Sequence, residues 1–257
     1  MPARRASAPR SARPPAHLER VRLPLADGAA TTLHVARHPL PGTSVRVVRL
    51  AHPEPLASWC RREGVAEALV GGFFVRPHGA PLGELRTRGI LRRSVAFAAP
   101  WGEVRACLHV HRGRIAIARR DELPADPRGD LLQAGPLLVR GGTPVVSDGD
   151  PEGFSAAAGQ FDSDITRGRY PRAALGVARG HLLAVACDGR ADDEAGLTLR
   201  ELAEALAALG AEDALNLDGG GSTSLVCGGE LRNVPREEHG VVLAGGRAVS
   251  TALVFRP

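Results

Sequence analysis

The chain has 257 residues, of which 44% are hydrophobic, so it is long enough to bury a sizeable core in one large domain or two small ones. Every one of its 33 basic residues is arginine, and the absence of lysine excludes a Walker-type phosphate loop and a lysine Schiff base. The net charge is +5, but the arginines are interspersed with acids and aromatic residues make up only 4%, which argues against nucleic-acid binding. We attribute the missing lysine to coding bias. No apolar run reaches the ~20 residues of a membrane span.

The N-terminal segment, residues 1–17, is rich in Arg, Pro, Ala and Ser. It lacks the apolar stretch of a secretory signal, so we predict a disordered tail followed by a single domain over residues 18–257. As written, the chain is expected to be cytoplasmic, whereas a misassigned start codon would leave an extracytoplasmic location open. The basic tail is also the sole support for nucleic-acid binding, which remains a minor alternative.

The first half of the domain alternates short strand-like and helix-like segments. Residues 45–50 read as a strand, and residues 53–62 as a short helix that Gly64 ends. A second strand over residues 68–70 runs into a glycine pair at 71–72. Because glycine accepts close backbone contact, we expect this pair to line one wall of a ligand site.

Further short strands follow in the middle of the chain. Residues 106–111 and 114–118 alternate and are separated by an Arg-Gly turn, which predicts a β-hairpin. Residues 133–139 form another apolar strand, which ends in a turn over residues 140–142. The acidic segment 147–168 is predicted to be a loop over one side of the domain.

A strand, a helix and a strand follow in the last third of the chain. The apolar runs 182–187 and 214–217 flank a segment, 198–209, that opens on Thr-x-x-Glu and repeats leucine on one helical face. This order predicts a βαβ unit with parallel strands. If the strands are parallel, Asp188 and Asp218 lie at the same edge of the sheet, where open α/β sheets bind ligands.

The segment 214–223 is the most informative in the chain, because a buried strand ends on Asp218 and three adjacent glycines follow. Adjacent glycines are entropically costly, and their N–H groups can converge on an anion. A tight turn with a solvated aspartate is the alternative. Asn216 alternates with Asp218, so both side chains can face one side of the strand. We expect the substrate to be held by Asn216, Gly219, Gly220, Gly221, Ser222 and Thr223.

The cysteines and histidines give little support for a metal site. The four cysteines form no Cys-x-x-Cys pair, and three lie in apolar strand-like runs where a free thiol behaves as a small hydrophobe. His109 and His111 share one strand face but have no neighbouring ligands in the sequence. We therefore predict no metal site and no cofactor, and leave a divalent metal requirement and the oligomeric state open.

Several segments, in this order and approximate spacing, resemble the phosphodiester glycosidase family, to which the lysosomal "uncovering" enzyme belongs. Each motif alone is weak, but the ordered set is specific and extends from about residue 65 to the C-terminus. The similar segments are residues 71–74, 81–83, 133–139, 170–177, 188–190, 196–203, 214–223 and 233–235.

The pattern along the chain predicts a mixed α/β fold with a mixed sheet, many short strands and few helices, and the resemblance implies a single α/β domain. It also implies a hydrolase that cleaves the glycosidic bond of a sugar-1-phosphate diester or a related glycan. Such a reaction needs a carboxylate near the anomeric carbon. We take Asp218 as that carboxylate and Asp188 as a supporting or general acid–base group, although either aspartate could simply cap a turn.

Two further features bear on the substrate. The planar guanidinium of Arg172 suits a pair of phosphate oxygens, with a surface salt bridge as the alternative. Gly71 and Gly72 are expected to form the wall opposite the glycine loop. The family motif usually begins with Asn, but Val70 stands there in this chain. This departure keeps open a non-catalytic domain that binds a glycan or a sugar phosphate on the same fold.

Overall fold

The computed structural model describes residues 16–99, 101–146 and 168–257, and strands predominate in these ranges. The prediction of many short strands and few helices is confirmed. The acidic segment 147–167 and the first fifteen residues of the predicted tail lie outside the described residues. His17 does not belong to a tail, because it begins the first strand.

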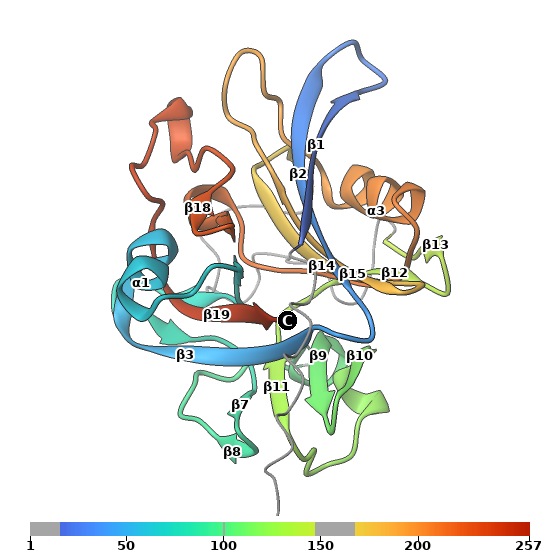
Figure 1. Cartoon of the computed structure of the whole chain (residues 1–257), viewed down its shortest axis with the longest axis vertical. Coiled ribbons are helices and arrows are strands. Elements are labelled where there is room, and N and C mark those ends of the chain that lie inside the picture. Colours follow the sequence, from blue (N-terminus) through green and yellow to red (C-terminus); the bar gives the residue numbers. More distant parts are fainter. Residues whose placement is uncertain (1–15, 100, 147–167) are drawn as a thin grey trace, which may run out of the picture.

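A seven-stranded sheet forms one side of the molecule (Figure 1), and each of its neighbouring pairs is antiparallel. The middle strands of this sheet are apolar, because other elements cover both of their faces. The strands, in spatial order, are β1 (His17–Pro24), β2 (Ala30–Pro39), β15 (His181–Cys187), β14 (Arg172–Ala178), β16 (Ala211–Asn216), β12 (Leu137–Arg140) and β13 (Thr143–Pro144).

The predicted βαβ unit is not present as a pair of neighbouring strands. β14 lies between β15 and β16 and is antiparallel to both, a partner that the local sequence pattern does not reveal. β15 and β16 consequently run in the same direction. Their carboxyl ends therefore lie at one edge of the sheet, beside the beginning of β14.

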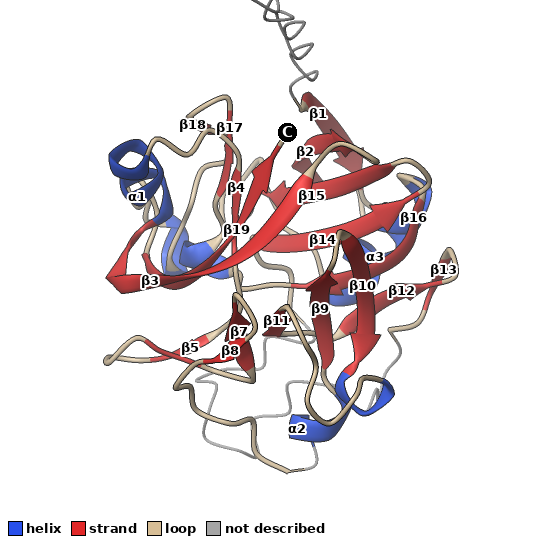
Figure 2. Ribbon diagram, turned by 60° about the horizontal axis from the view of Figure 1, so that its bottom comes forward, coloured by secondary structure: helices blue, strands red, loops and turns tan. Residues whose placement is uncertain are grey.

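The described part of the fold also contains two five-stranded antiparallel sheets (Figure 2). One contains β10 (Arg114–Arg119), β9 (Ala106–His111), β11 (Asp130–Gln133), β7 (Leu85–Thr87) and β8 (Ile90–Leu91). The other contains β18 (Glu230–Leu231), β17 (Leu225–Cys227), β4 (Ala68–Val70), β19 (Ala248–Arg256) and β3 (Ser44–Pro55). A short pair is formed by β5 (Phe74–Val75) and β6 (Ala80–Pro81).

These sheets confirm one strand prediction and correct another. β9 and β10 form the predicted hairpin, and Arg112 and Gly113 both take the positive φ of its tight turn. The single strand predicted over residues 133–139 is wrong. Gln133 ends β11 in one sheet and Leu137 begins β12 in another, so the chain changes sheet between them.

The helices are short and lie outside the sheets. α1 (Leu56–Glu63) ends at Gly64, which adopts the predicted left-handed conformation with φ of 65°. α3 (Leu199–Ala208) begins with the predicted capping box between Thr198 and Glu201, and it packs on β12 and β16. α2 (Trp101–Val104) is a single turn. None of the helices in the described ranges has the length and apolar character needed to cross a membrane.

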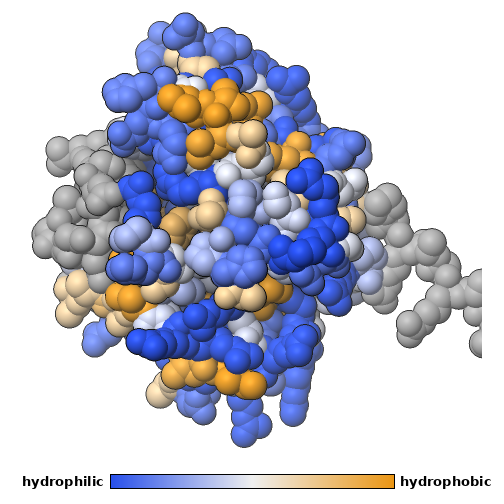
Figure 3. Space-filling view, turned by 90° about the vertical axis from the view of Figure 1, so that its left-hand side faces the viewer, coloured by the Kyte–Doolittle hydropathy of each residue, from blue (hydrophilic) through white to orange (hydrophobic). Residues whose placement is uncertain are grey.

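One cluster of buried hydrophobic side chains takes residues from all three large sheets, because β3 contacts β7 and β11 while β16 contacts β9 and β10. The four cysteines are buried and free. The face in Figure 3 is largely hydrophilic, with apolar residues in separate small groups. The most exposed large apolar residues of the described chain include Ile90, Leu91, Val241 and Val242.

Candidate active site

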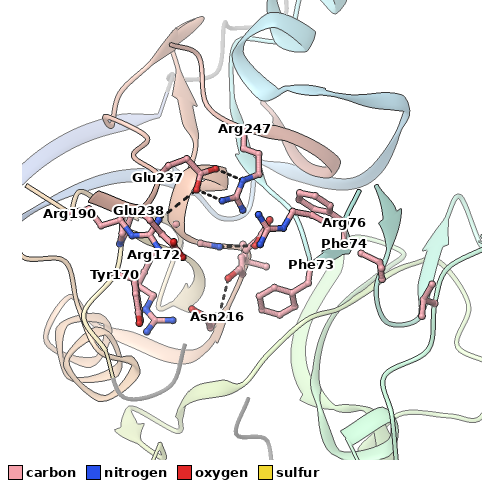
Figure 4. Close-up of a pocket in the computed structure, with 17 residues that line it drawn as sticks. Phe73, Phe74, Arg76, Tyr170, Arg172, Arg190, Asn216, Glu237, Glu238 and Arg247 are labelled. Carbon is pink, nitrogen blue, oxygen red and sulfur yellow. Dashed lines mark hydrogen bonds and ion pairs between the residues drawn. The ribbon is translucent and has the colours of Figure 1, made fainter. Parts of the chain in front are cut away.

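A cavity of about 780 Å³ opens at the sheet edge where β16 ends and β14 begins. Tyr170, Arg172 and Arg190 lie on one side of it, and Phe73 and Arg76 on the other (Figure 4). The C-terminal segment 237–247 adds a third border. The cavity therefore draws on parts of the chain that are up to about 170 residues apart.

Asp218 lines this cavity, as the sequence predicts for a site residue. Its backbone N–H donates to Gly71 O (3.1 Å), and its Oδ1 accepts from Gly219 N–H (3.0 Å). Its Oδ2 is buried and has no hydrogen-bond partner among the described residues. A buried acceptor without a partner is costly, so this oxygen is available for a donor from outside the described residues.

The pKa of the Asp218 carboxyl is shifted by its burial at the cavity. Burial raises the pKa of its carboxyl from 3.8 to about 6, because the charged form loses its hydration. The Ser222 hydroxyl, Arg247, the Gly219 N–H and Arg76 act in the opposite direction. A carboxyl with a pKa near 6 can change its protonation state near neutral pH, which acid–base catalysis requires.

The glycine loop after Asp218 does not form the open anion-binding nest that the sequence suggests. Gly220 N–H donates to Pro171 O, and the N–H groups of Ser222 and Thr223 close a short 3₁₀ turn onto Gly219 O and Gly220 O. These donors are already used within the protein. Gly219 and Gly220 line the cavity, whereas Gly221, Ser222 and Thr223 lie behind its lining.

Close packing explains the glycines better. A Cβ at Gly219 would lie 2.8 Å from Pro171 O, and one at Gly221 would lie 2.8 Å from Glu237 Oε1. Gly220 takes a φ of 60°, which L side chains rarely adopt. The loop is thus held between the start of β14 and the C-terminal segment, and this fixes Asp218 at the cavity.

Asn216 ends β16, two residues before Asp218, and also lines the cavity. Its side-chain N–H group donates to Leu217 O (2.9 Å) and Gly135 O (3.3 Å). Its Oδ1 is buried and, like the Asp218 Oδ2, lacks a partner within the described ranges. The cavity floor therefore presents two unsatisfied acceptors, which suit the hydroxyl or amide hydrogens of a sugar.

Asp188 occupies the corresponding strand end but is not among the cavity-lining residues. It is 4% exposed, and its carboxylate oxygens contact His34 Nε2 (2.8 Å) and accept from Val234 N–H (2.7 Å). Both oxygens are therefore occupied. Asp188 anchors the start of the C-terminal segment that borders the cavity, which suits a supporting role rather than contact with a ligand.

Gly71 and Gly72 are also behind the lining, which begins at Phe73. A Cβ at Gly71 would lie 2.8 Å from the Thr251 backbone, so the close packing of β19 leaves room only for glycine at this position. Gly72 N–H donates to Thr251 Oγ1 (3.0 Å). The glycine pair thus lies behind the cavity lining and holds the Asp218 backbone through the hydrogen bond from Asp218 N–H to Gly71 O.

Arg172 lines the cavity, as predicted, and is 3% exposed. Its Nε donates to Leu197 O (3.0 Å) and its Nη2 to Gly168 O (3.1 Å). Burial lowers the pKa of its guanidinium to about 10, which leaves it positively charged at neutral pH. The surface salt bridge weighed as an alternative does not describe this buried side chain.

Tyr170 links Arg172 to a second arginine. The guanidinium carbons of Arg172 and Arg190 each lie 5.3 Å from the centre of its ring, within the range of cation–π contacts. Arg190 adopts a φ of 59° and its Nη1 donates to Arg236 O (3.2 Å). Two positive charges are thereby held on one wall.

Sequence reasoning did not single out several residues of the cavity. Phe73, Tyr170 and Arg190 lie within segments that carry the family resemblance, which was an available signal. Nothing local marks the others, because they reach the cavity only through the tertiary fold. The residues missed are Phe73, Arg76, Tyr170, Arg190, Glu237, Glu238 and Arg247.

Val70, which replaces the asparagine of the family motif, is fully buried in β4 and does not line the cavity. Its N–H donates to Ser224 O (3.0 Å). Val70 is therefore part of the core beneath the cavity rather than of its lining.

Comparison with known proteins agrees with the resemblance seen in the sequence. The family model "Phosphodiester glycosidase" matches residues 63–256, and the chain belongs to this family. No match was found among curated proteins.

Solved structures with similar folds include the catalytic domain of zebrafish N-acetylglucosamine-1-phosphodiester alpha-N-acetylglucosaminidase, auto-inhibited by its pro-peptide. It has a TM-score of 0.70 and 22% identity, over 98% of this chain and 87% of that one. A hypothetical protein from Synechocystis gives 0.62 and 21%, over 94% of this chain but only 62% of its own. A presumed exported protein of Burkholderia pseudomallei K96243 gives 0.63 and 18%, over 90% and 74%.

Proposed function

We propose that the protein is a hydrolase that cleaves the glycosidic bond of a sugar-1-phosphate diester or a related glycan, with Asp218 as its catalytic carboxylate. Membership of the phosphodiester glycosidase family supports the glycosidase class. The observation that carries the assignment to Asp218 is its buried, unpartnered Oδ2 in a cavity bordered by arginines.

In this proposal the anionic phosphate lies toward Arg172 and Arg190, and the sugar lies over Asn216 and Asp218. The C1–O bond to phosphate breaks, and its electron pair stays on the phosphate oxygen. Water adds at C1 and gives a proton to the Asp218 carboxylate. A phosphate monoester leaves readily, and the arginines stabilise its charge, so a separate acid for the leaving group matters less than in ordinary glycosidases.

Asp188 then acts at a distance, by holding Val234 and so the segment that carries Glu237 to Arg247. No cofactor is part of this scheme. Export, suggested for the Burkholderia protein by its name, would suit an enzyme that acts on surface glycans.

The experiment is a screen of purified protein against chromogenic glycosides and sugar-1-phosphate diesters, with and without EDTA. Asp218→Asn should lower turnover by about two orders of magnitude or more, the scale of positioned acid–base catalysis. Asp213→Asn on β16, the strand that leads to Asp218, is the matched control, because Asp213 does not line the cavity. Hydrolysis of no diester, together with glycan binding, would favour the non-catalytic binding domain. Equal turnover in Asp218→Asn and wild type would remove Asp218 from the chemistry.

A further inference from the structure

A carboxylate of the protein itself already occupies part of the arginine-lined side of the cavity. Glu237 binds Arg247 with both oxygens, with Oε1 2.7 Å from Arg247 Nε and Oε2 bonded to Nη2. Its Oε2 also lies 3.8 Å from Arg190 Nη1. Figure 4 shows Glu237 between these two arginines. A carboxylate bound by two arginine donors resembles a phosphate group with two free oxygens.

The position of Glu237 is fixed from several sides. Its N–H donates to Val241 O (2.8 Å), and Arg247 N–H donates to Gly221 O (2.8 Å). The missing Cβ of Gly221 leaves room for Glu237 Oε1. The side chain of Glu237 is only 29% exposed and that of Arg247 only 23%. The pair is therefore a built part of the cavity border and not a mobile surface ion pair.

Glu238 follows directly in the chain and borders the same cavity, but it is exposed. Its side chain makes no hydrogen bond or ion pair with the described residues. Because water screens an exposed charge, Glu238 acts on a bound anion far less than Glu237 does.

The proposed reaction changes the charge of the phosphate. A diester carries one negative charge, whereas the phosphate monoester formed when the C1–O bond breaks carries between one and two near neutral pH. Repulsion between Glu237 and a bound anion grows in proportion to the charge of that anion. Glu237 therefore repels a fully ionised monoester about twice as strongly as the diester.

We propose that Glu237 lowers the preference of the arginine-lined cavity for doubly charged phosphomonoesters over singly charged phosphodiesters, and thereby favours release of the monoester product. The inference rests on the proposed function for the identity of substrate and product. In molecular terms, one carboxylate limits the negative charge that the arginines accept.

The test compares phenyl phosphate with its methyl ester, methyl phenyl phosphate, which differ by one methyl group and one charge. Binding is measured by isothermal titration calorimetry at pH 8 and low salt, where the monoester is doubly charged. Wild type should prefer the monoester over the diester less strongly than Glu237→Gln does. Glu237→Gln should strengthen diester binding by about 3-fold and monoester binding by about 10-fold, since the logarithm of the effect scales with ligand charge.

Two further variants separate charge selection from structural damage. Glu237→Asp keeps the charge and should keep the wild-type preference. Glu238→Gln removes an equal charge one residue away and should change both affinities by less than about 2-fold, because that carboxylate is exposed. Melting temperatures establish that each variant is folded.

An equal factor for both ligands in Glu237→Gln would overturn the inference, as would a Glu238→Gln effect of the same size. Absence of binding by every variant would also overturn it. These outcomes do not depend on turnover. A protein that discriminates the two esters but hydrolyses no diester would reject the proposed function and retain the selectivity of Glu237. Hydrolysis with no change of preference in Glu237→Gln would reject the selectivity alone.

Discussion

Two strand ends at the same edge of the seven-stranded sheet are each followed by an Asp-Gly pair, but the two aspartates have opposite properties. Asp188-Gly189 follows β15 and Asp218-Gly219 follows β16, with Pro171 between them. At Asp188 both carboxylate oxygens have partners, whereas at Asp218 one oxygen is buried without any in the described chain. An Asp-Gly pair after an apolar strand therefore marks the sheet edge, but distant segments decide whether the aspartate keeps an oxygen without a partner. We call Asp188, whose two oxygens have partners, the closed end, and Asp218, which has one oxygen without a partner in the described chain, the open end.

The largest effect on stability is expected at the closed end. Asp188→Ala removes the partner of the Val234 N–H and of His34 Nε2 in a buried place. A buried imidazole and a partly buried N–H group would lose their bonds, so the free energy of unfolding should fall by about 2–4 kcal/mol in denaturant titrations. Asp192→Ala, at an exposed position four residues along, is the control and should change stability little. A loss below ~1 kcal/mol in Asp188→Ala would mean that the two strand ends are more alike than the contacts indicate.

The glycines after the two aspartates should behave alike, in contrast to the aspartates. A Cβ at Gly189 would lie 2.8 Å from Pro171 N, and one at Gly219 would lie 2.8 Å from Pro171 O. Each Gly→Ala change should therefore destabilise the protein by about 1–3 kcal/mol, the usual cost of overpacking. Unfolding curves of the two variants provide the measurement. A large loss in one and none in the other would show that Pro171 does not hold both ends equally.

The open end should give stability an unusual dependence on pH. The pKa of Asp218 is about 6 in the folded protein against an ordinary 3.8, so the folded state binds this proton more tightly. This contribution favours folding at low pH and is lost as pH rises through 6. Asp218→Asn should match wild type at pH 4 and exceed its free energy of unfolding by about 1–3 kcal/mol at pH 8. Greater stability of wild type at pH 8 would instead mean that the fold stabilises the Asp218 carboxylate.

A smaller effect is expected at Arg172, which begins β14 between the two ends. Arg172→Lys cannot keep the donors to both Leu197 O and Gly168 O, and it lacks the planar fork for a phosphate. We expect about 10-fold weaker binding of a sugar phosphate, equivalent to one lost charged hydrogen bond, and little change for a neutral sugar. Calorimetry with both ligands is the measurement, and exposed Arg200→Lys on α3 is the control. Unchanged affinity for the sugar phosphate would remove Arg172 from the binding site.

The sequence was sufficient for features that depend on neighbouring residues. The capping box at Thr198, the turn at Arg112-Gly113 and the left-handed Gly64 all have local causes, and all three are found. The order of the family motifs was likewise enough to identify the phosphodiester glycosidase family.

Features that depend on distant partners could not be predicted. β14 lies between β15 and β16, and no pattern within residues 182–217 indicates an inserted antiparallel strand. Asp188 is closed by His34, which lies 154 positions earlier in the chain. The glycine loop looked like an anion-binding nest because its sequence does not show that Pro171 O already accepts from Gly220 N–H. Glu237 and Arg247 carry no local signal and reach the cavity only through the path of the C-terminal segment.

The most direct test of the account compares kcat and melting temperature for Asp218→Asn and Asp188→Asn on one hydrolysed sugar-1-phosphate diester. The open aspartate should matter for chemistry and the closed one for stability. Asp218→Asn should therefore lower kcat by about 100-fold or more without lowering the melting temperature, and Asp188→Asn should lower the melting temperature with a kcat within about 10-fold of wild type. A folded Asp188→Asn variant that loses more activity than Asp218→Asn would contradict the account.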